Sequence, residues 1–249
     1  MDDKIKYLHD CIIIKDILVI GDIHIGHDGV HGRAMFPKAQ LDNIIEKLER
    51  VFDNLENEKV NRVVLLGDVK HDFGKISDAE WRETLELLDY LKKKCDKIIV
   101  IKGNHDTMLE PILKKRNVLL KDYYKVRIDG ESWCFLHGNE MFKQCLDSDW
   151  LVFGHLHPAI TLYDKYKGEK FKCFLKGKWE GKKVLILPSF SEFSLGYDLS
   201  DVENLESRKG DRKRKFFVIE NKDLKKMDVV IYNSLEKKVH DFGKLRKII

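Results

Sequence analysis

Three short apolar runs in the first half of the chain each end in a glycine followed by a polar residue. They occupy residues 16–22 (DILVIGD), 62–68 (RVVLLGD) and 97–106 (KIIVIKGNHD). A short continuous apolar run that is bounded by turn residues is typical of a buried strand. The pattern therefore predicts three buried strands, each of which leads into a polar turn.

Two longer amphipathic segments separate these runs. In residues 38–59 the apolar side chains fall on one face at helical spacing, and residues 77–96 follow the same period. Ser77 and Glu80 form a capping box at the start of the second segment, and lysines crowd its end, where the helix dipole favours them. Strands that alternate with helices predict βαβ units on a largely parallel sheet.

The second half of the chain contains short apolar runs with little helical pattern between them. The stretches 166–170 (YKGEK) and 179–183 (WEGKK) have the glycine and polar residues of hairpin turns. This pattern predicts a second sheet that packs against the first, and so a layered α/β fold. Its expected strands lie at 132–138, 150–157, 159–166, 170–177 and 182–189.

No segment rich in proline, glycine and serine divides the chain. We therefore expect residues 1–249 to form a single domain, with a motif-bearing core at about 16–190. The runs at 214–220 and 227–233 are expected to be C-terminal strands that complete the second sheet. The basic run 206–215 is expected to be a solvated loop, with a contact to a phosphate backbone as the alternative.

The composition favours an intracellular protein and does not by itself require a nucleic-acid or membrane partner. Of the 249 residues, 43% are hydrophobic, which is enough for a sizeable core. The net charge of +4 permits anionic substrates without demanding nucleic acid. The N-terminus is charged, and no apolar stretch is long enough to span a membrane. We expect a cytoplasmic protein with no membrane partner.

The five cysteines are scattered and form no C-x-x-C pair. An odd number without regular spacing favours reduced, mostly structural thiols in a cytosolic protein. Their positions are 11, 95, 134, 145 and 173.

Polar side chains with metal-binding chemistry follow the expected strands. Ligands of α/β sheets bind beyond the carboxyl ends of the strands, so residues in these turns are expected to meet at one site. Carboxylates gathered there repel one another unless a divalent cation neutralises them. The residues concerned are Asp22, His24, Asp68, Asn104, His105, Asp106, His137, His155 and His157.

Two pairs of these residues have a spacing suited to metal ligation. Asp22 and His24 are two positions apart, as are His155 and His157, so each pair faces one way on an extended chain. Asp68 could be shared between the two pairs, which would then hold two ions. Nitrogen and oxygen ligands without a thiolate suit Mn²⁺, Fe²⁺, Zn²⁺ or Ni²⁺ better than Ca²⁺ or Mg²⁺. The alternative is a set of polar turns without metal.

The motifs GDIH (21–24), GD (67–68), GNHD (103–106) and GHLH (154–157), together with His137, resemble the signature of the calcineurin-like metallophosphoesterases. More narrowly, the stretches GDIHIG, GDVKH and GHLHPAI are similar to the small archaeal phosphoesterases related to the SbcD nuclease subunit. The resemblance implies a layered α/β/β/α sandwich of two mixed sheets.

The resemblance also implies a dinuclear metal site and assigns its ligands. Asp68 would bridge two divalent transition-metal ions, Mn²⁺ first, with Ni²⁺, Fe²⁺ or Zn²⁺ as alternatives. His105 would stand near the leaving group, and Asp106 would orient it. The first ion would be held by Asp22, His24 and His157, and the second by Asn104, His137 and His155.

The implied activity is the hydrolysis of a phosphodiester bond by a hydroxide that bridges the two ions. The expected substrate is a nucleotide or a nucleic acid, including single strands. A phosphomonoesterase or nucleotidase on the same ligands is the alternative, and a catalytically silent scaffold of the same fold is a further one. The capping domain of the larger nucleases is not expected after the last motif-bearing loop, which disfavours processive work on duplex DNA. Protein partners and oligomeric state stay open.

Three other features are candidates for substrate contact. His71, three residues after Asp68, is expected either to face the phosphate or to cap its loop. Arg33 could grip a phosphate, with an ordinary surface arginine as the alternative. The aromatic residues of 188–198 could stack a base or pack the second sheet.

Overall fold

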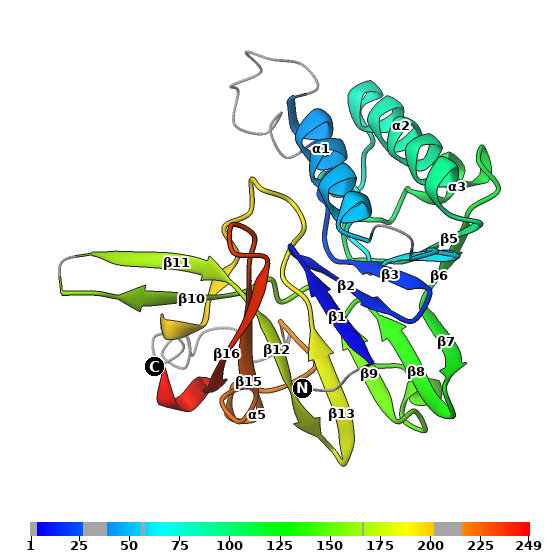
Figure 1. Cartoon of the computed structure of the whole chain (residues 1–249). Coiled ribbons are helices and arrows are strands. Elements are labelled where there is room, and N and C mark those ends of the chain that lie inside the picture. The colour runs from blue at the N-terminus through cyan, green and yellow to red at the C-terminus, as the bar shows by residue number, and fades with distance from the viewer. Residues whose placement is uncertain (1–3, 27–38, 56–57, 166, 202–215) are drawn as a thin grey trace.

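The structure is a computed structural model that describes residues 4–26, 39–55, 58–165, 167–201 and 216–249. Two β-sheets pack face to face, and helices cover the outer face of the first sheet (Figure 1). A third, smaller sheet extends to one side of the second (Figure 1). The expected fold class, α/β with mixed sheets in layers, is confirmed.

The first sheet contains the three strands expected from the first half of the chain. Strands β3 to β6 pair in parallel, while β1 and β2 form an antiparallel meander with β3. Parallel pairing directs the carboxyl ends of β3, β4 and β5 to one edge of the sheet. The strands, in sheet order, are β1 (Ile5–Leu8), β2 (Cys11–Ile14), β3 (Ile17–Ile20), β4 (Arg62–Leu65), β5 (Lys97–Ile101) and β6 (Leu119–Lys121).

The two expected helices are present on the outer face of this sheet. Helix α1 (Ala39–Asp53) follows β3 and helix α2 (Asp78–Lys94) follows β4, so the βαβ arrangement is confirmed. The shorter α3 (Glu110–Lys114) follows β5. The apolar face of α1 is buried against the sheet through side chains such as Leu41 and Leu48.

The second sheet has seven strands and packs against the first sheet. Its central strands β8, β9 and β13 run parallel to one another, and hairpins supply the others. The hairpin expected at 179–183 is confirmed, with Glu180 and Gly181 both at positive φ. In sheet order the strands are β16 (Lys238–Lys244), β15 (Asp228–Asn233), β12 (Phe174–Trp179), β13 (Lys182–Ile186), β9 (Trp150–Phe153), β8 (Glu131–Leu136) and β7 (Tyr123–Ile128).

The third sheet is built on a hairpin that projects from the body of the molecule (Figure 1). In sheet order its strands are β11 (Gly168–Lys172), β10 (Pro158–Tyr163) and β14 (Tyr197–Asp198). The remaining short elements are helix α5 (Asn221–Leu224) and 3₁₀ turns at Lys143–Cys145, Leu199–Asp201 and Leu245–Lys247.

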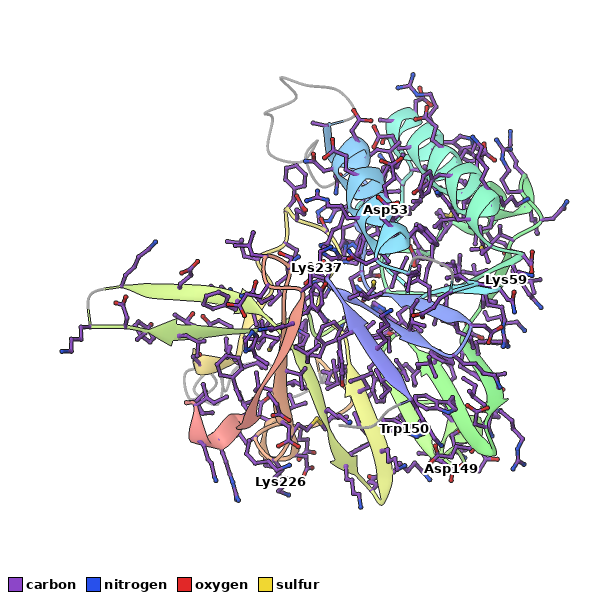
Figure 2. All side chains as sticks on the ribbon, viewed as in Figure 1. Asp53, Lys59, Asp149, Trp150, Lys226 and Lys237 are labelled. Carbon is purple, nitrogen blue, oxygen red and sulfur yellow. A yellow bond between two sulfur atoms is a disulfide. The ribbon has the colours of Figure 1, made fainter. Side chains whose placement is uncertain are left out.

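Alternation along the strands divides the core into layers. In β3, Leu18 and Ile20 face the helices, while Ile17 and Val19 face the second sheet. The layer between the sheets includes Trp133 and Trp150, whose rings stack 4.4 Å apart. Trp150 opens β9, at the end of the strand remote from the polar turn that follows it (Figure 2).

Two expectations about strands need correction. Of the run 214–220, the described residues 216–220 form no strand; instead, Phe217 and Ile219 pack on the outer face of the second sheet. The closing strands are β15, which was expected, and β16, which was not. The N-terminal strands β1 and β2 were also missed, because their charged and polar turn residues interrupt the apolar runs.

The expectation of reduced cysteines is wrong for two of them. Cys134 and Cys145 are joined as a disulfide, with their Cα atoms 5.7 Å apart, while Cys11, Cys95 and Cys173 are free. Their sequence separation of 11 carried no signal, because the two meet only once the chain after β8 has folded back. Within the described residues, no helix has the length and apolar character needed to cross a membrane.

The capping box at the start of α2 is confirmed and also holds the preceding loop. The Ser77 hydroxyl accepts from Glu80 N at 3.1 Å, and the Glu80 carboxylate accepts from Ser77 N at 2.9 Å and from Asp72 N at 3.0 Å.

Replacing Ser77 with alanine is expected to lower the free energy of unfolding by about 1 kcal/mol, because one helix N–H loses its acceptor. Urea denaturation measures the change. Ser77→Thr keeps a hydroxyl that can accept from Glu80 N and donate to Glu80 Oε2, and it should stay close to the wild type. An equal loss in both variants would show that the cap is not the cause.

Candidate metal site at the strand ends

The loops that follow β3, β4, β5, β8 and β9 converge where the two sheets meet. The β3 loop is tied to the β4 loop, since His24 N donates to Asp68 O at 2.9 Å. It is tied to the second sheet because His155 N donates to the Asp22 carboxylate at 3.0 Å. All seven ligand residues expected from the sequence lie in these loops: Asp22, His24, Asp68, Asn104, His137, His155 and His157.

One group of possible ligands consists of Asp22, His24 and His157, whose ligand atoms all lie within 4.8 Å of one another. His157 Nε2 is 3.1 Å from Asp22 Oδ1 and 3.4 Å from His24 Nε2. Burial lowers the pKa of His24 to about 3, so its imidazole is neutral near pH 7. A neutral imidazole has the free nitrogen lone pair that a metal ligand needs.

A second group consists of Asp68, His137 and His155, again within 4.8 Å. His137 Nδ1 lies 2.7 Å from the carbonyl oxygen of Leu66, so Nδ1 carries a proton that it donates. Its Nε2 faces the site, 3.0 Å from Asn104 Oδ1 and 3.3 Å from Asp68 Oδ2.

The same arrangement holds for His155. Its Nε2 donates to the carbonyl oxygen of Phe216 at 2.8 Å, and its Nδ1 lies 3.0 Å from His137 Nε2. With His137 Nε2 unprotonated, two ring nitrogens and two oxygens would point their lone pairs at one place. Such a set needs a positive charge at its centre, and a divalent cation with nitrogen and oxygen ligands fits it.

The raised pKa of His137 also indicates that the carboxylates of the site favour a positive charge beside them. Burial alone would lower the pKa of His137, but the carboxylates of Asp68 and Asp22 outweigh it and raise the pKa to about 9. A bound cation would take the place of this proton.

Asp68 lies at the centre of the site. Its Oδ2 is 3.3 Å from His137 Nε2, 3.8 Å from His105 Nε2 and 3.9 Å from His24 Nε2. Burial raises the pKa of Asp68, but His137 and His24 outweigh it and hold the pKa well below its usual range. Asp68 is thus a charged carboxylate within reach of both groups.

Five of the seven residues have a backbone conformation that side chains other than glycine rarely adopt. Such conformations cost free energy and persist only where the surrounding structure enforces them, which is common at functional sites. The φ angles are 26° at Asp22, 53° at His24, 48° at Asp68, 62° at His155 and 49° at His157.

The orientation of His105 differs from the expectation. Asp106 is fully buried, and its carboxylate accepts from the backbone N–H groups of Gly103 and Val69, both at 3.0 Å. It therefore joins the β4 and β5 loops, and its hydrogen-bond partners are backbone N–H groups and not the imidazole. The ring of His105 instead forms a short hydrogen bond from Nδ1 to the carbonyl of His71.

His71, expected either to face the phosphate or to cap its loop, lies beside His24 and His105. Its ring centroid lies 5.3 Å from that of His24 and 5.5 Å from that of His105, and the three could together hold a metal. Sequence reasoning missed Phe73, whose ring lies 3.7 Å from that of His105 and whose side chain is 66% exposed. An aromatic residue two positions after His71 was the available signal.

The loop 188–198 contributes support more than aromatic lining. Phe190 is fully buried in the core beneath α1, whereas Phe193 is 42% exposed. Ser189 Oγ donates to the main-chain carbonyl of Asp22 at 2.8 Å. Arg33 and the basic run 206–215 lie outside the described residues.

Comparison with known proteins places this geometry in context. The sequence profile of the calcineurin-like phosphoesterases matches residues 15–200. No curated protein matches the chain.

Among solved structures, the chain is similar to the nuclease MPE of Pseudomonas putida, with 18% identity, 89% of this chain and 88% of that chain covered, and a TM-score of 0.55. This likeness shows a shared fold. The chain is more distantly similar to an archaeal phosphodiesterase, with 16% identity, 91% of this chain and 98% of that chain covered, and a TM-score of 0.40. A third is Vps29 of Entamoeba histolytica complexed with zinc (18% identity, 90% and 96% covered, TM-score 0.42).

Proposed function

Because this chain belongs to the calcineurin-like phosphoesterase family, we propose that it is a metal-dependent phosphodiesterase acting on a nucleotide or a nucleic acid. The observation that carries the proposal is the set of lone pairs around Asp68. The nitrogens of His137 and His155 face each other at 3.0 Å, each with its proton held on the opposite side of the ring. This arrangement supports one divalent cation beside His137 and His155, and the group of Asp22, His24 and His157 supports a second.

The proposed ligands follow the two groups. Asp68 would be shared, which its central distances support. The lack of a thiolate favours Mn²⁺, with Ni²⁺, Fe²⁺ or Zn²⁺ as alternatives. The first ion would be held by Asp22, His24 and His157, and the second by Asn104, His137 and His155.

When bound, the ions would activate a water molecule as nucleophile and neutralise charge on the phosphoryl oxygens. The protein's own groups orient the reaction. His105 donates from Nδ1 to the carbonyl of His71, which turns Nε2 toward the site, 3.8 Å from Asp68. A second proton on Nε2 could pass to the leaving oxygen.

The preference for a nucleotide or nucleic acid rests on Phe73. One face of its ring packs on His105, beside the place proposed for the leaving group, and most of the side chain is exposed. Exposed aromatic rings stack the bases of single strands without regard to sequence. The nuclease of Pseudomonas putida, which shares the fold, supports the same substrate class.

The proposal treats residues 1–249 as one domain. The core between the two sheets supports this, because it joins Ile5 of β1 to Val230 of β15.

Metal-free protein supplied with Mn²⁺ is expected to cleave bis-p-nitrophenyl phosphate faster than p-nitrophenyl phosphate. Asn104→Ala should reduce the diester rate by about 10²-fold or more, because it removes a proposed ligand. Asn43→Ala, on α1, is the matched control and should leave the rate unchanged. Absorbance of released p-nitrophenolate measures the two wild-type rates and the diester rate of each variant. Ni²⁺, Zn²⁺ and Mg²⁺ are compared in the same assay.

Two results would contradict the proposal. Faster monoester cleavage would indicate a phosphomonoesterase on the same ligands. Absence of turnover with every metal, in protein that binds two ions per chain, would favour a silent scaffold.

A further inference from the structure

Three consecutive main-chain carbonyls after β13 are each held by a lysine ammonium group. Lys172 Nζ donates to Ser189 O at 2.9 Å and to Ser191 O at 2.6 Å. Lys47 Nζ donates to Phe190 O at 2.8 Å. The segment is thus fixed from one side by two cations that come from β11 and α1.

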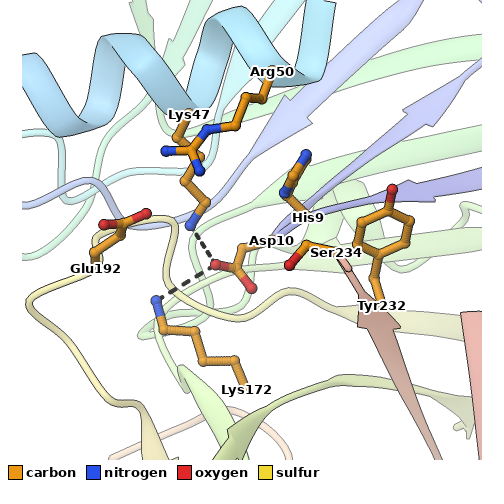
Figure 3. A pocket seen from close by; sticks show the side chains of 8 residues that line it. All are labelled: His9, Asp10, Lys47, Arg50, Lys172, Glu192, Tyr232 and Ser234. Carbon is orange, nitrogen blue, oxygen red and sulfur yellow. Dashed lines mark hydrogen bonds and ion pairs between the residues drawn. The ribbon is translucent and has the colours of Figure 1, made fainter. Parts of the chain in front are cut away.

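Both ammonium groups also meet one carboxylate (Figure 3). Asp10, in the turn between β1 and β2, forms a short ion pair with Lys47 and lies 3.6 Å from Lys172 Nζ. The side chains are largely shielded from solvent, with exposed fractions of 7% for Lys47, 15% for Lys172 and 20% for Asp10. Shielded charges are stable only when paired and hydrogen-bonded, so the three side chains and the three carbonyls depend on one another.

The other side of the same segment faces the proposed metal site. Ser189 Oγ donates to Asp22 O at 2.8 Å, and Ser191 N donates to the same carbonyl at 3.4 Å. Farther along, Ser194 Oγ lies 3.4 Å from His157 Nδ1. Among the described residues, the hydrogen bonds of these serines reach Asp22 and His157 of the first ligand group and no ligand of the second.

A cavity of about 280 Å³ opens beside the cluster and is lined by further polar residues, including His9, Arg50 and Glu192 (Figure 3). A small anion there would have to compete with contacts already made. Lys172 donates to two carbonyls and pairs with Asp10. Lys47 donates to one carbonyl and also pairs with Asp10. The cluster is therefore better suited to hold the segment than to hold a ligand.

We propose that Lys172, Lys47 and Asp10 are positioning residues that fix the segment Ser189–Ser191 behind Asp22, and so shape one of the two metal sites. This inference rests on the proposed function. Asp22 has a φ of 26°, a conformation that its surroundings must enforce. The carbonyl of Asp22 is held by Ser189, and the carbonyl of Ser189 is held in turn by Lys172.

The test is a calorimetric titration of metal-free protein with Mn²⁺. In Lys172→Met, the affinity for one of the two Mn²⁺ ions is expected to fall by about 10–100-fold. A loss of this size is usual when a group behind a metal ligand is removed. The other ion should bind within about 3-fold of wild type, because no hydrogen bond joins Asn104, His137 or His155 to the described segment 189–191. Lys6→Met, which removes an exposed ion pair with Glu58, is the matched control and should change neither ion.

A second variant guards against a general loss of folding. Ser189→Ala removes only the hydroxyl that holds Asp22, and it should weaken the same ion by a similar factor. In the double variant the two effects should not add, because both act along one chain of contacts.

The outcomes separate the two proposals. Equal weakening of both ions, full additivity in the double variant, or unchanged binding in Lys172→Met would overturn the positioning role while leaving the metal site intact. A wild-type protein that binds no Mn²⁺ would overturn the proposed function and this inference with it.

Discussion

Asp68→Asn is expected to reduce phosphodiesterase activity by about 10³-fold or more and to prevent two ions from binding together. Loss of a group that only supports a ligand costs about 10–100-fold in metal affinity or activity, and Asp68 is itself the carboxylate that the two ions are proposed to share. Its Oδ1 accepts from His105 N at 2.9 Å, a bond that the amide oxygen can keep. The amide NH₂ would then face His137 Nε2 and place a donor where the cation belongs.

This prediction separates loss of metal from loss of fold. Because asparagine has the shape of aspartate, the variant should melt cooperatively in the metal-free state. Metal analysis after dialysis against Mn²⁺ should give two ions per wild-type chain and at most one in the variant. Asp53→Asn, an exposed residue on α1 (Figure 2), is the matched control. Two bound ions in Asp68→Asn, with more than a tenth of the wild-type rate, would refute the shared ligand.

Gly103→Ala is expected to disrupt the site and the fold together. A Cβ on Gly103 would lie 2.1 Å from Asp68 Oδ1 and 2.3 Å from Asp68 N. The second of these is a backbone atom, so the clash cannot be relieved by rotating a side chain. We expect the free energy of unfolding to fall by about 3 kcal/mol, the upper part of the range for overpacked sites. Activity should fall with it, because Asp68 must move.

Gly130→Ala provides the comparison. Gly130 lies in the β7–β8 hairpin with a φ of +85°, and nothing stands within 4 Å of its added Cβ. Its cost is conformational alone, about 1–2 kcal/mol, and activity should be unchanged. Urea denaturation and the diester assay, run on both variants, measure the contrast. A Gly103→Ala protein that keeps full activity would show that Asp68 is not held where the structure has it.

Much of the site could be predicted from the sequence because its residues are tied to local patterns. Each candidate ligand stands directly after an apolar run, and parallel strands bring such positions to one edge. The first two helices and the capping box at Ser77 were predicted in the same way, from period and spacing. The resemblance to a known family added the grouping of the ligands, which spacing alone left open.

The partners of the site residues could not be predicted in this way. The ring of His105 is oriented by the carbonyl of His71, 34 positions away, and not by its neighbour Asp106. Which nitrogen of His155 faces the site depends on the carbonyl of Phe216, 61 positions away. No local pattern encodes such contacts, because a main-chain carbonyl is present at every position and only packing selects one.

By itself, the sequence determined the alternation of strands and helices in the first half of the chain, the chemistry of the turns and the family. Those properties follow from near neighbours, where hydrophobic period, capping and turn residues act. Tertiary structure alone decided the tautomers of the site histidines, the strained backbone at the ligands, the pairing of Cys134 with Cys145 and the cluster behind Asp22. That cluster joins Asp10, Lys47 and Lys172, and the site joins residues more than 130 positions apart. Such groups meet only when two sheets pack, because the energy that brings them together is the burial of the whole core between them.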